Sequence, residues 1–143
     1  MEKYKSITQD EIKVGMKAEK SKRVTEEDVT LFAEVTGDKN PAHVDEEYAK
    51  GTMFKTRIAH GMLGSGLISA VLGMELPGPG TIYLGQELKF VNPIKFDDVI
   101  SAKIIVREIL DKKKFKIAIM DTVVVNQDGQ TVIEGTAKVI PPR

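Results

Sequence analysis

The chain has 143 residues, a length typical of one domain, and we expect a single domain over residues 1–143. It contains no cysteine, which excludes disulfide frameworks, thiolate metal sites and cysteine nucleophiles. Its 21 basic and 21 acidic residues balance, so there is no overall basic field to attract nucleic acid or an anionic lipid surface. The chain starts with polar residues, and its longest apolar stretch, residues 66–74, is about half a bilayer span. We therefore expect a soluble cytoplasmic protein that binds neither nucleic acid nor membrane.

The first predicted helix begins after Thr25 and ends at Gly37. Thr25 can cap free backbone N–H groups, and Asp28 occupies the position of the acid in a capping box. Val24 and Val29 flank the cap with the spacing of a hydrophobic staple. Gly37 is the residue type that commonly ends a helix in the left-handed conformation.

The segment after this helix is predicted to be a loop over residues 38–44. The reason is the Asn40-Pro41 pair, because a proline disfavours helical geometry at the residue before it. A short helix is expected next, over residues 45–49.

Residues 60–75 are rich in apolar and small residues and nearly free of charge, which predicts a helix buried on all sides. Gly61, Gly64 and Gly66 would each weaken this helix by up to about 1 kcal/mol. Their presence indicates that something approaches the helix backbone closely, and a wrapping sheet is one candidate.

The second half of the chain alternates apolar and polar residues with the period of half-buried strands. Strands are predicted over residues 16–24, 81–91, 99–110, 115–126 and 131–140. The Asp-Gly pair at residues 128–129 is a strong hairpin signal between the last two. The pattern predicts an α+β fold, with an antiparallel sheet of about five strands and one long buried helix.

The chain has only two histidines, His43 and His60, and His43 follows Asp38 by five residues across a proline-containing bend. A carboxylate that takes a proton and an imidazole that shares or returns it suit the addition or removal of water near neutral pH. In the alternative reading, Asp38 satisfies turn N–H groups and His43 caps the next helix or packs as a half-buried ring. An isolated pair favours that alternative. A metal site that adds Asp45 and His60 is weaker still, because an aspartate at a helix start is an ordinary cap.

Gly61 opens the predicted buried helix. The first N–H groups of a helix lack internal partners and carry the positive end of its dipole, so they can hold a developing oxyanion. Gly61 has no side chain to obstruct a carbonyl oxygen that approaches its N–H. Taken alone, it is better explained as a residue that lets the chain enter the helix tightly. The glycine spacing does not fit a dinucleotide-binding loop.

A long ordered pattern covers both regions. Residues 32–45 read Phe-Ala-Glu-Val-Thr-Gly-Asp-Lys-Asn-Pro-Ala-His-Val-Asp, and they are followed by Phe54, Ile58 and Ala-His-Gly-Met-Leu at residues 59–63. This pattern resembles the signature of the MaoC-like (R)-specific enoyl-CoA hydratases, and the surrounding elements match that family over most of the chain. The resemblance favours the catalytic reading of the carboxylate and imidazole pair.

The resemblance implies the hotdog fold, an antiparallel sheet wrapped around a long central helix, in a homodimer whose sheets lie side by side. It implies reversible hydration of a trans-2-enoyl thioester to the (R)-3-hydroxyacyl product, with no metal or redox cofactor and with coenzyme A as part of the substrate. By position, it implies Asp38 as the main base toward water, His43 as the residue that holds this water and helps protonate C2, and the Gly61 N–H as donor to the thioester oxygen. Ser69 and Asn40 are implied as further substrate-binding residues.

Three other functions stay open. The same chemistry could act on an acyl carrier protein, as a (3R)-hydroxyacyl-[acyl-carrier-protein] dehydratase. Lys50, Lys55 and Arg57 lie near the motif and would suit such a carrier, but the phosphates of coenzyme A would need the same residues. A non-catalytic acyl-thioester-binding hotdog protein is expected to lack an acid or a base, and both are present here. A thioesterase is the third. The chain departs from the family at Asp97-Asp98, where relatives often carry Gly-Asp, a change expected to alter a turn.

Overall fold

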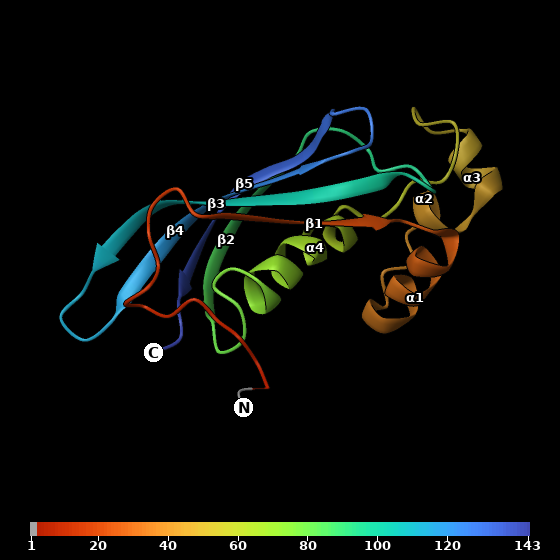
Figure 1. The fold of residues 1–143 in the computed structure, drawn as a ribbon. Helices are drawn as coiled ribbons and strands as arrows, with labels where there is room; N and C mark the ends of the chain where they lie inside the picture. The colour runs from red at the N-terminus through yellow and green to blue at the C-terminus, as the bar shows by residue number, and fades with distance from the viewer. Residues whose placement is uncertain (1–2) are drawn as a thin grey trace.

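The protein is described by a computed structural model over residues 3–143. A five-stranded antiparallel sheet curls around one long helix, and the three shorter helices gather at one end of that helix (Figure 1). The strands are β1 (Lys17–Arg23), β2 (Ile82–Phe90), β3 (Val99–Asp111), β4 (Lys116–Val125) and β5 (Thr131–Ile140). The helices are α1 (Glu26–Thr36), α2 (Pro41–Val44), α3 (Glu46–Lys50) and α4 (Gly61–Met74). The strand order β1-β3-β4-β5-β2 and the central α4 confirm the predicted α+β hotdog fold. Within the described residues, no helix is long and apolar enough to cross a bilayer.

Helix α4 is the centre of the hydrophobic core. Ile68, Val71 and Leu72 are at most 1% exposed, and they form one cluster with the inward side chains of the sheet. The close approach predicted for its glycines is confirmed at Gly64, where an added Cβ would lie 2.5 Å from the Cδ1 atom of Ile94.

The same prediction is confirmed at Gly61 and is wrong at Gly66. A Cβ on Gly61 would lie 2.6 Å from the Cδ1 atom of Phe90, at the end of β2. A Cβ on Gly66 would meet nothing within 4 Å, because Gly66 is exposed and lies on the side of α4 that the sheet leaves open.

Helix α1 begins and ends as its sequence predicts. The Thr25 side chain accepts a hydrogen bond from the Asp28 N–H at 3.1 Å, and the Asp28 carboxylate accepts one from the Thr25 N–H at 2.9 Å. Val24 and Val29 are fully buried on either side of this capping box. Gly37 ends the helix with a φ of 79°, in the left-handed region.

The structure differs from the sequence prediction at residues 41–44, which form the short helix α2 instead of a loop. The backbone of Asn40 is non-helical, with a φ of −52° and a ψ of 126°, as expected before a proline, but Pro41 occupies the first helical position, where its fixed φ is favourable. The Asn40 side chain accepts a hydrogen bond from the Ala42 N–H at 3.1 Å and caps the helix. Asp45 then caps α3 through the Tyr48 N–H.

The departure from the family at Asp97 coincides with a strained backbone position. Asp97 has a φ of 70°, a conformation that glycine adopts freely and that other residues rarely adopt. Its carboxylate forms an ion pair with Arg23 at 2.9 Å, which partly offsets the cost of that conformation. The glycine that the resemblance leads us to expect at this position would adopt this turn geometry without strain.

Candidate active site

A pocket of about 510 Å³ opens beside the N-terminus of α4. It brings together three of the five residues that the resemblance implicates, Asp38, His43 and Gly61. Its remaining wall comes from the loop before α4, the first turn of α4, the end of β2 and the segment that follows, with one residue from β5: Met53, Phe54, Ile58, Ala59, His60, Met62, Phe90, Val91, Asn92, Pro93, Ile94 and Ile133. Apolar walls with a few converging polar groups are typical of small-molecule sites.

The His43 imidazole is oriented by a backbone carbonyl. His43 lies on α2, and its Nδ1 atom is 2.7 Å from the Ile58 oxygen. A carbonyl oxygen only accepts, so Nδ1 carries the hydrogen and donates it. In the neutral ring, Nε2 then presents the lone pair and can accept a proton.

His60 supports this site from within the core. It is 2% exposed, and its Nε2 atom donates to the backbone oxygen of Asp38 at 2.9 Å. Its ring lies against the ring of His43, with 4.0 Å between the centroids, and against the ring of Phe32 at 4.6 Å. The sequence prediction gave His60 no role beyond preceding Gly61. The structure shows that it fastens the Asp38 backbone to the start of α4.

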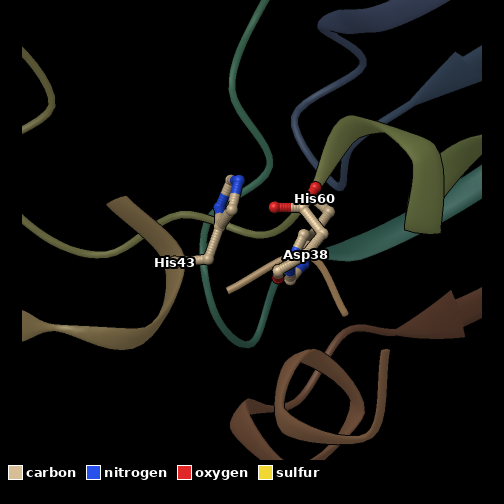
Figure 2. Close-up of side chains that lie close together, drawn as sticks. All are labelled: Asp38, His43 and His60. Carbon is tan, nitrogen blue, oxygen red and sulfur yellow. The ribbon is translucent and has the colours of Figure 1, made fainter. Parts of the chain in front are cut away.

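The Asp38 side chain is exposed and lies close to both rings (Figure 2). One carboxylate oxygen of Asp38 and one ring nitrogen each of His43 and His60 lie within 4.8 Å of one another. The Asn40 N–H donates to the Asp38 carboxylate at 3.3 Å, so the turn orients this side chain. The carboxylate can therefore accept a proton from a small molecule in the pocket.

The same three residues are poorly arranged for a metal ion. The planes of the two imidazole rings meet at only 30°, and the rings lie face against face. A metal at about 2.0–2.1 Å from a nitrogen of each ring would have to lie in both ring planes, and planes tilted by 30° between rings this close together meet far from the nitrogens. The geometry therefore suits a proton relay better than a metal site.

Gly61 provides an uncapped helix start at the pocket. His60 is the N-cap residue of α4, and no side chain of the described residues caps this end. The Gly61 N–H makes no backbone hydrogen bond within residues 3–143. The close approach of Phe90 leaves no room for a side chain at Gly61, and both residues line the pocket.

Asn40 and Ser69 do not line this pocket. The Asn40 oxygen is engaged in capping α2. Ser69 is exposed on α4, eight residues after Gly61, which corresponds to about 12 Å along the helix. Their substrate-binding roles stay predictions.

Comparison with known proteins supports the family that the sequence pattern resembles. A family model described as MaoC like domain matches residues 8–134. An (R)-specific enoyl-CoA hydratase from Rhodospirillum rubrum is 49% identical over 133 residues, which cover 93% of this chain and 90% of that protein. The structure of an unliganded R-hydratase from Pseudomonas aeruginosa has a TM-score of 0.90 and 46% identity, covering 98% of this chain and 88% of that one. An (R)-hydratase from A. caviae has a TM-score of 0.86 and 39% identity, covering 92% of this chain and 98% of that one. This chain belongs to the MaoC-like domain family.

Proposed function

We propose that this protein is an (R)-specific enoyl-CoA hydratase of fatty acid metabolism, which adds water reversibly to trans-2-enoyl-CoA and gives (R)-3-hydroxyacyl-CoA. One observation carries the assignment. A single pocket holds a carboxylate, an imidazole whose Nε2 atom is left free to accept a proton, and an uncapped helix N-terminus. The 49% identity to an (R)-specific enoyl-CoA hydratase supports the same reaction.

The chemistry of hydration requires these groups. When water attacks C3 of the enoyl thioester, electron density moves through C2 onto the thioester oxygen. In our proposal, Asp38 accepts a proton from the attacking water, and His43 holds that water through Nε2 and helps to deliver a proton to C2. The Gly61 N–H, at the positive end of the α4 dipole, donates to the thioester oxygen while it carries negative charge. The C2=C3 π bond and one O–H bond of the water break, a C–O bond forms at C3, and the proton taken up by Asp38 ends on C2 in the new C–H bond, so the reaction consumes one water and no external electrons.

This reaction needs no redox cofactor, because the addition of water leaves the combined oxidation state of C2 and C3 unchanged. We propose that coenzyme A enters only as part of the substrate and that the enzyme uses no metal ion. The small separation of 4.0 Å and the 30° tilt between the His43 and His60 rings support the absence of a metal ion. The cytoplasmic location expected from the sequence stays a prediction.

The first test is an assay of the purified protein in the presence of EDTA, with trans-2-enoyl-CoA substrates of short, medium and long chain. We expect loss of the enoyl thioester absorbance and, on chiral analysis, the (R)-3-hydroxyacyl product. Asp38→Asn and His43→Ala should each lower the rate by on the order of 100-fold or more without loss of the fold. Thermal unfolding of both variants serves as the control for the fold.

Other outcomes would each contradict the proposal. Release of free thiol with the enoyl group intact would indicate a thioesterase, and binding without turnover would indicate an acyl-thioester-binding protein. Faster turnover of the same acyl group on acyl carrier protein would assign the carrier-linked dehydratase reaction. Wild-type rates in both variants would remove Asp38 and His43 from the mechanism.

We also propose that the protein forms a homodimer through β2. This strand lies at an edge of the sheet, and its Ile82, Tyr83 and Leu84 side chains are between 41% and 56% exposed. An open strand edge that carries large apolar side chains is a surface that another chain can pair with.

A further inference from the structure

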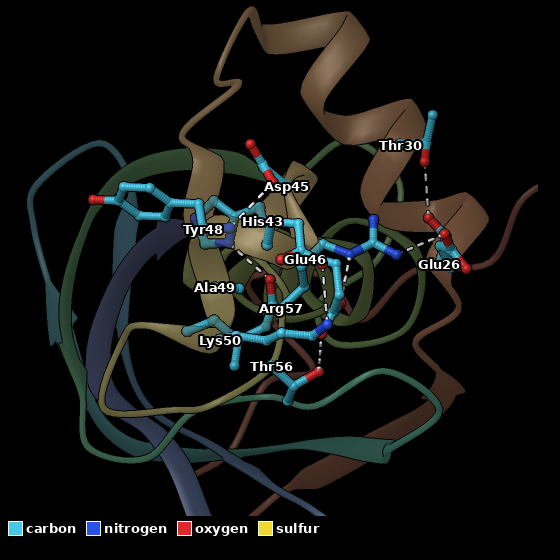
Figure 3. Close-up of polar contacts among 12 residues, drawn as sticks. Glu26, Thr30, His43, Asp45, Glu46, Tyr48, Ala49, Lys50, Thr56 and Arg57 are labelled. Carbon is cyan, nitrogen blue, oxygen red and sulfur yellow. Dashed lines mark hydrogen bonds and ion pairs between the residues drawn. The ribbon is translucent and has the colours of Figure 1, made fainter.

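Arg57 lies four residues before Gly61, in the segment that enters α4. Its Nη2 atom donates to the Glu26 carboxylate at 2.7 Å, and its Nε atom donates to the Glu46 carboxylate at 3.1 Å (Figure 3). The guanidinium carbon also lies 4.9 Å from the centroid of the Phe96 ring. The Arg57 side chain is only 19% exposed, whereas the side chains of Glu26 and Glu46 are 64% and 45% exposed. Arg57 therefore joins the first turn of α1, the first turn of α3 and the loop after β2.

These contacts leave Arg57 poorly suited to the phosphate-binding role that the sequence allowed. The hydrogen bond to Glu26 is the largest cause that raises the pKa of the Arg57 guanidinium, and the hydrogen bond to Glu46 raises it further. The hydrogen bond from Arg57 in turn lowers the pKa of the Glu46 carboxyl. Arg57 and Glu46 are thus charged near neutral pH, and a phosphate that approached Arg57 would meet the two carboxylates already bound to it.

The segment that Arg57 anchors is the one that orients His43. Next to Arg57, the Ile58 oxygen accepts the hydrogen bond from His43 Nδ1 at 2.7 Å, and the Ile58 N–H donates to the Ala42 oxygen at 3.3 Å. Thr56, on the other side, donates to the Glu46 carboxylate at 3.1 Å. The ion pairs of Arg57 and the hydrogen bond of His43 thus involve consecutive residues, Arg57 and Ile58, of one short segment.

We propose that Arg57 is a positioning residue for this reaction. By anchoring its own segment to Glu26, Glu46 and Phe96, it holds the Ile58 carbonyl where that oxygen keeps the hydrogen of His43 on Nδ1. The inference rests on the proposed function, because the choice of ring nitrogen matters when His43 handles a proton. If the carbonyl shifts, the hydrogen can move to Nε2, and that form of the ring cannot accept a proton at the pocket.

Two variants of Arg57 and one matched control test this role by kinetics. Arg57→Met keeps an apolar stem over Phe96 and removes both ion pairs, and Arg57→Lys keeps the charge. Arg107→Met is the control, because Arg107 forms an ion pair with Asp121 at 2.7 Å, the same distance as between Arg57 and Glu26. This second pair lies on the sheet and does not line the pocket. With a short trans-2-enoyl-CoA, Arg57→Met should lower kcat by about 10- to 100-fold, with KM changed by about twofold or less. Arg57→Lys should recover part of the rate, and Arg107→Met should retain wild-type kcat.

The opposite kinetic pattern would overturn the proposal. A raised KM with wild-type kcat in Arg57→Met would mean that Arg57 binds the coenzyme A phosphates. An equal loss of kcat in Arg107→Met would mean that removal of any ion pair lowers the rate through stability.

Nitrogen NMR of the imidazole rings tests the same role without any substrate, and with only two histidines the ring signals are few. The wild-type spectrum should show His43 with its hydrogen on Nδ1, and Arg57→Met should show a mixture of the two ring forms. If Arg57→Met does not fold, Glu46→Gln, which removes one anchor only, should give a smaller change in the same direction. An unchanged His43 signal in the folded variants would refute the positioning role. A changed signal in a protein that hydrates no enoyl-CoA would instead refute the proposed function and leave the positioning of His43 standing.

Discussion

His43 is held on two sides, by the Ile58 carbonyl at Nδ1 and by the ring of His60, whereas the Asp38 carboxylate is held by one backbone N–H and faces solvent. This difference fits their proposed roles. The imidazole must keep one nitrogen free and aimed at a fixed point, while the carboxylate must reach a small, mobile water molecule. The Gly61 N–H is positioned by the backbone of the first turn of helix α4.

Substitution of Gly61 by alanine tests the close approach between α4 and β2. The new Cβ would lie 2.6 Å from the Cδ1 atom of Phe90, too close for unstrained packing, so the ring or the helix start must move. We expect Gly61→Ala to destabilise the fold by about 1–3 kcal/mol and to lower kcat through displacement of the Gly61 N–H. Urea unfolding and the hydration assay measure the two effects.

Gly66→Ala is the matched control within the same helix. A Cβ at Gly66 meets nothing within 4 Å, so the better helix propensity of alanine should stabilise the fold by about 0.5–1 kcal/mol and leave kcat unchanged. A Gly61→Ala variant as stable and as active as Gly66→Ala would show that Phe90 does not restrict the helix start.

At the scale of elements, the features readable from the sequence are those fixed by residues close together in the chain. The capping box of α1, the glycine that ends it and the Asp-Gly hairpin between β4 and β5 each occupy a few neighbouring residues, and all three form as predicted. The sequence prediction is wrong at helix α2, because it rests on the effect of Pro41 on the residue before it, whereas a proline at the first helical position favours a helix.

The candidate site likewise has residues that the sequence indicates and contacts that it does not. Asp38, His43 and Gly61 lie in one recognisable pattern, and the fold brings all three to one pocket. The contact between His60 and the Asp38 backbone spans 22 residues, and the one between Arg57 and Glu26 spans 31. Contacts of this length depend on how α1, α2 and α4 pack together, so no local spacing indicates them.

The capping box of α1 should make stability depend on pH in acid. The hydrogen bond from the Thr25 N–H, with help from Lys22, lowers the pKa of Asp28 below its usual value. The contribution of the ionised carboxylate is then fully present above the unfolded-state pKa of about 3.9 and is lost as the pH falls through the lower folded-state value. Asp28→Ala should cost about 1 kcal/mol at pH 7, and this difference from the wild type should shrink below about pH 4.

Urea unfolding across this pH range checks the expectation, with Glu27→Ala as its control. Glu27 is the neighbouring acid in the first turn of α1, and its carboxylate takes no part in the two capping-box hydrogen bonds between Thr25 and Asp28. A difference between Asp28→Ala and the wild type that stays constant from pH 7 to 3 would mean that the carboxylate charge does not contribute to the cap.

At the scale of the whole molecule, the two open edges of the sheet differ in character. The edge strand β1 has the sequence Lys-Ala-Glu-Lys-Ser-Lys-Arg, and charged side chains of this density discourage pairing with another strand. The opposite edge strand β2 begins Ile-Tyr-Leu-Gly and exposes these apolar side chains. It also ends at Phe90, in the wall of the pocket, so a second chain paired with β2 would lie next to the proposed active site.

Leu84→Lys tests whether two copies join through this edge. Leu84 is 50% exposed at an irregularity of β2, and a lysine there would place a charge on each of two paired edges. We expect wild-type protein to sediment as a dimer at micromolar concentration and Leu84→Lys to sediment as a folded monomer. Val35→Lys adds the same charge at an apolar residue that is 85% exposed on α1, and Figure 1 shows α1 well away from the start of β2, so this variant should remain dimeric. A monomeric wild type, or a Leu84→Lys variant that stays dimeric, would show that β2 is not the interface.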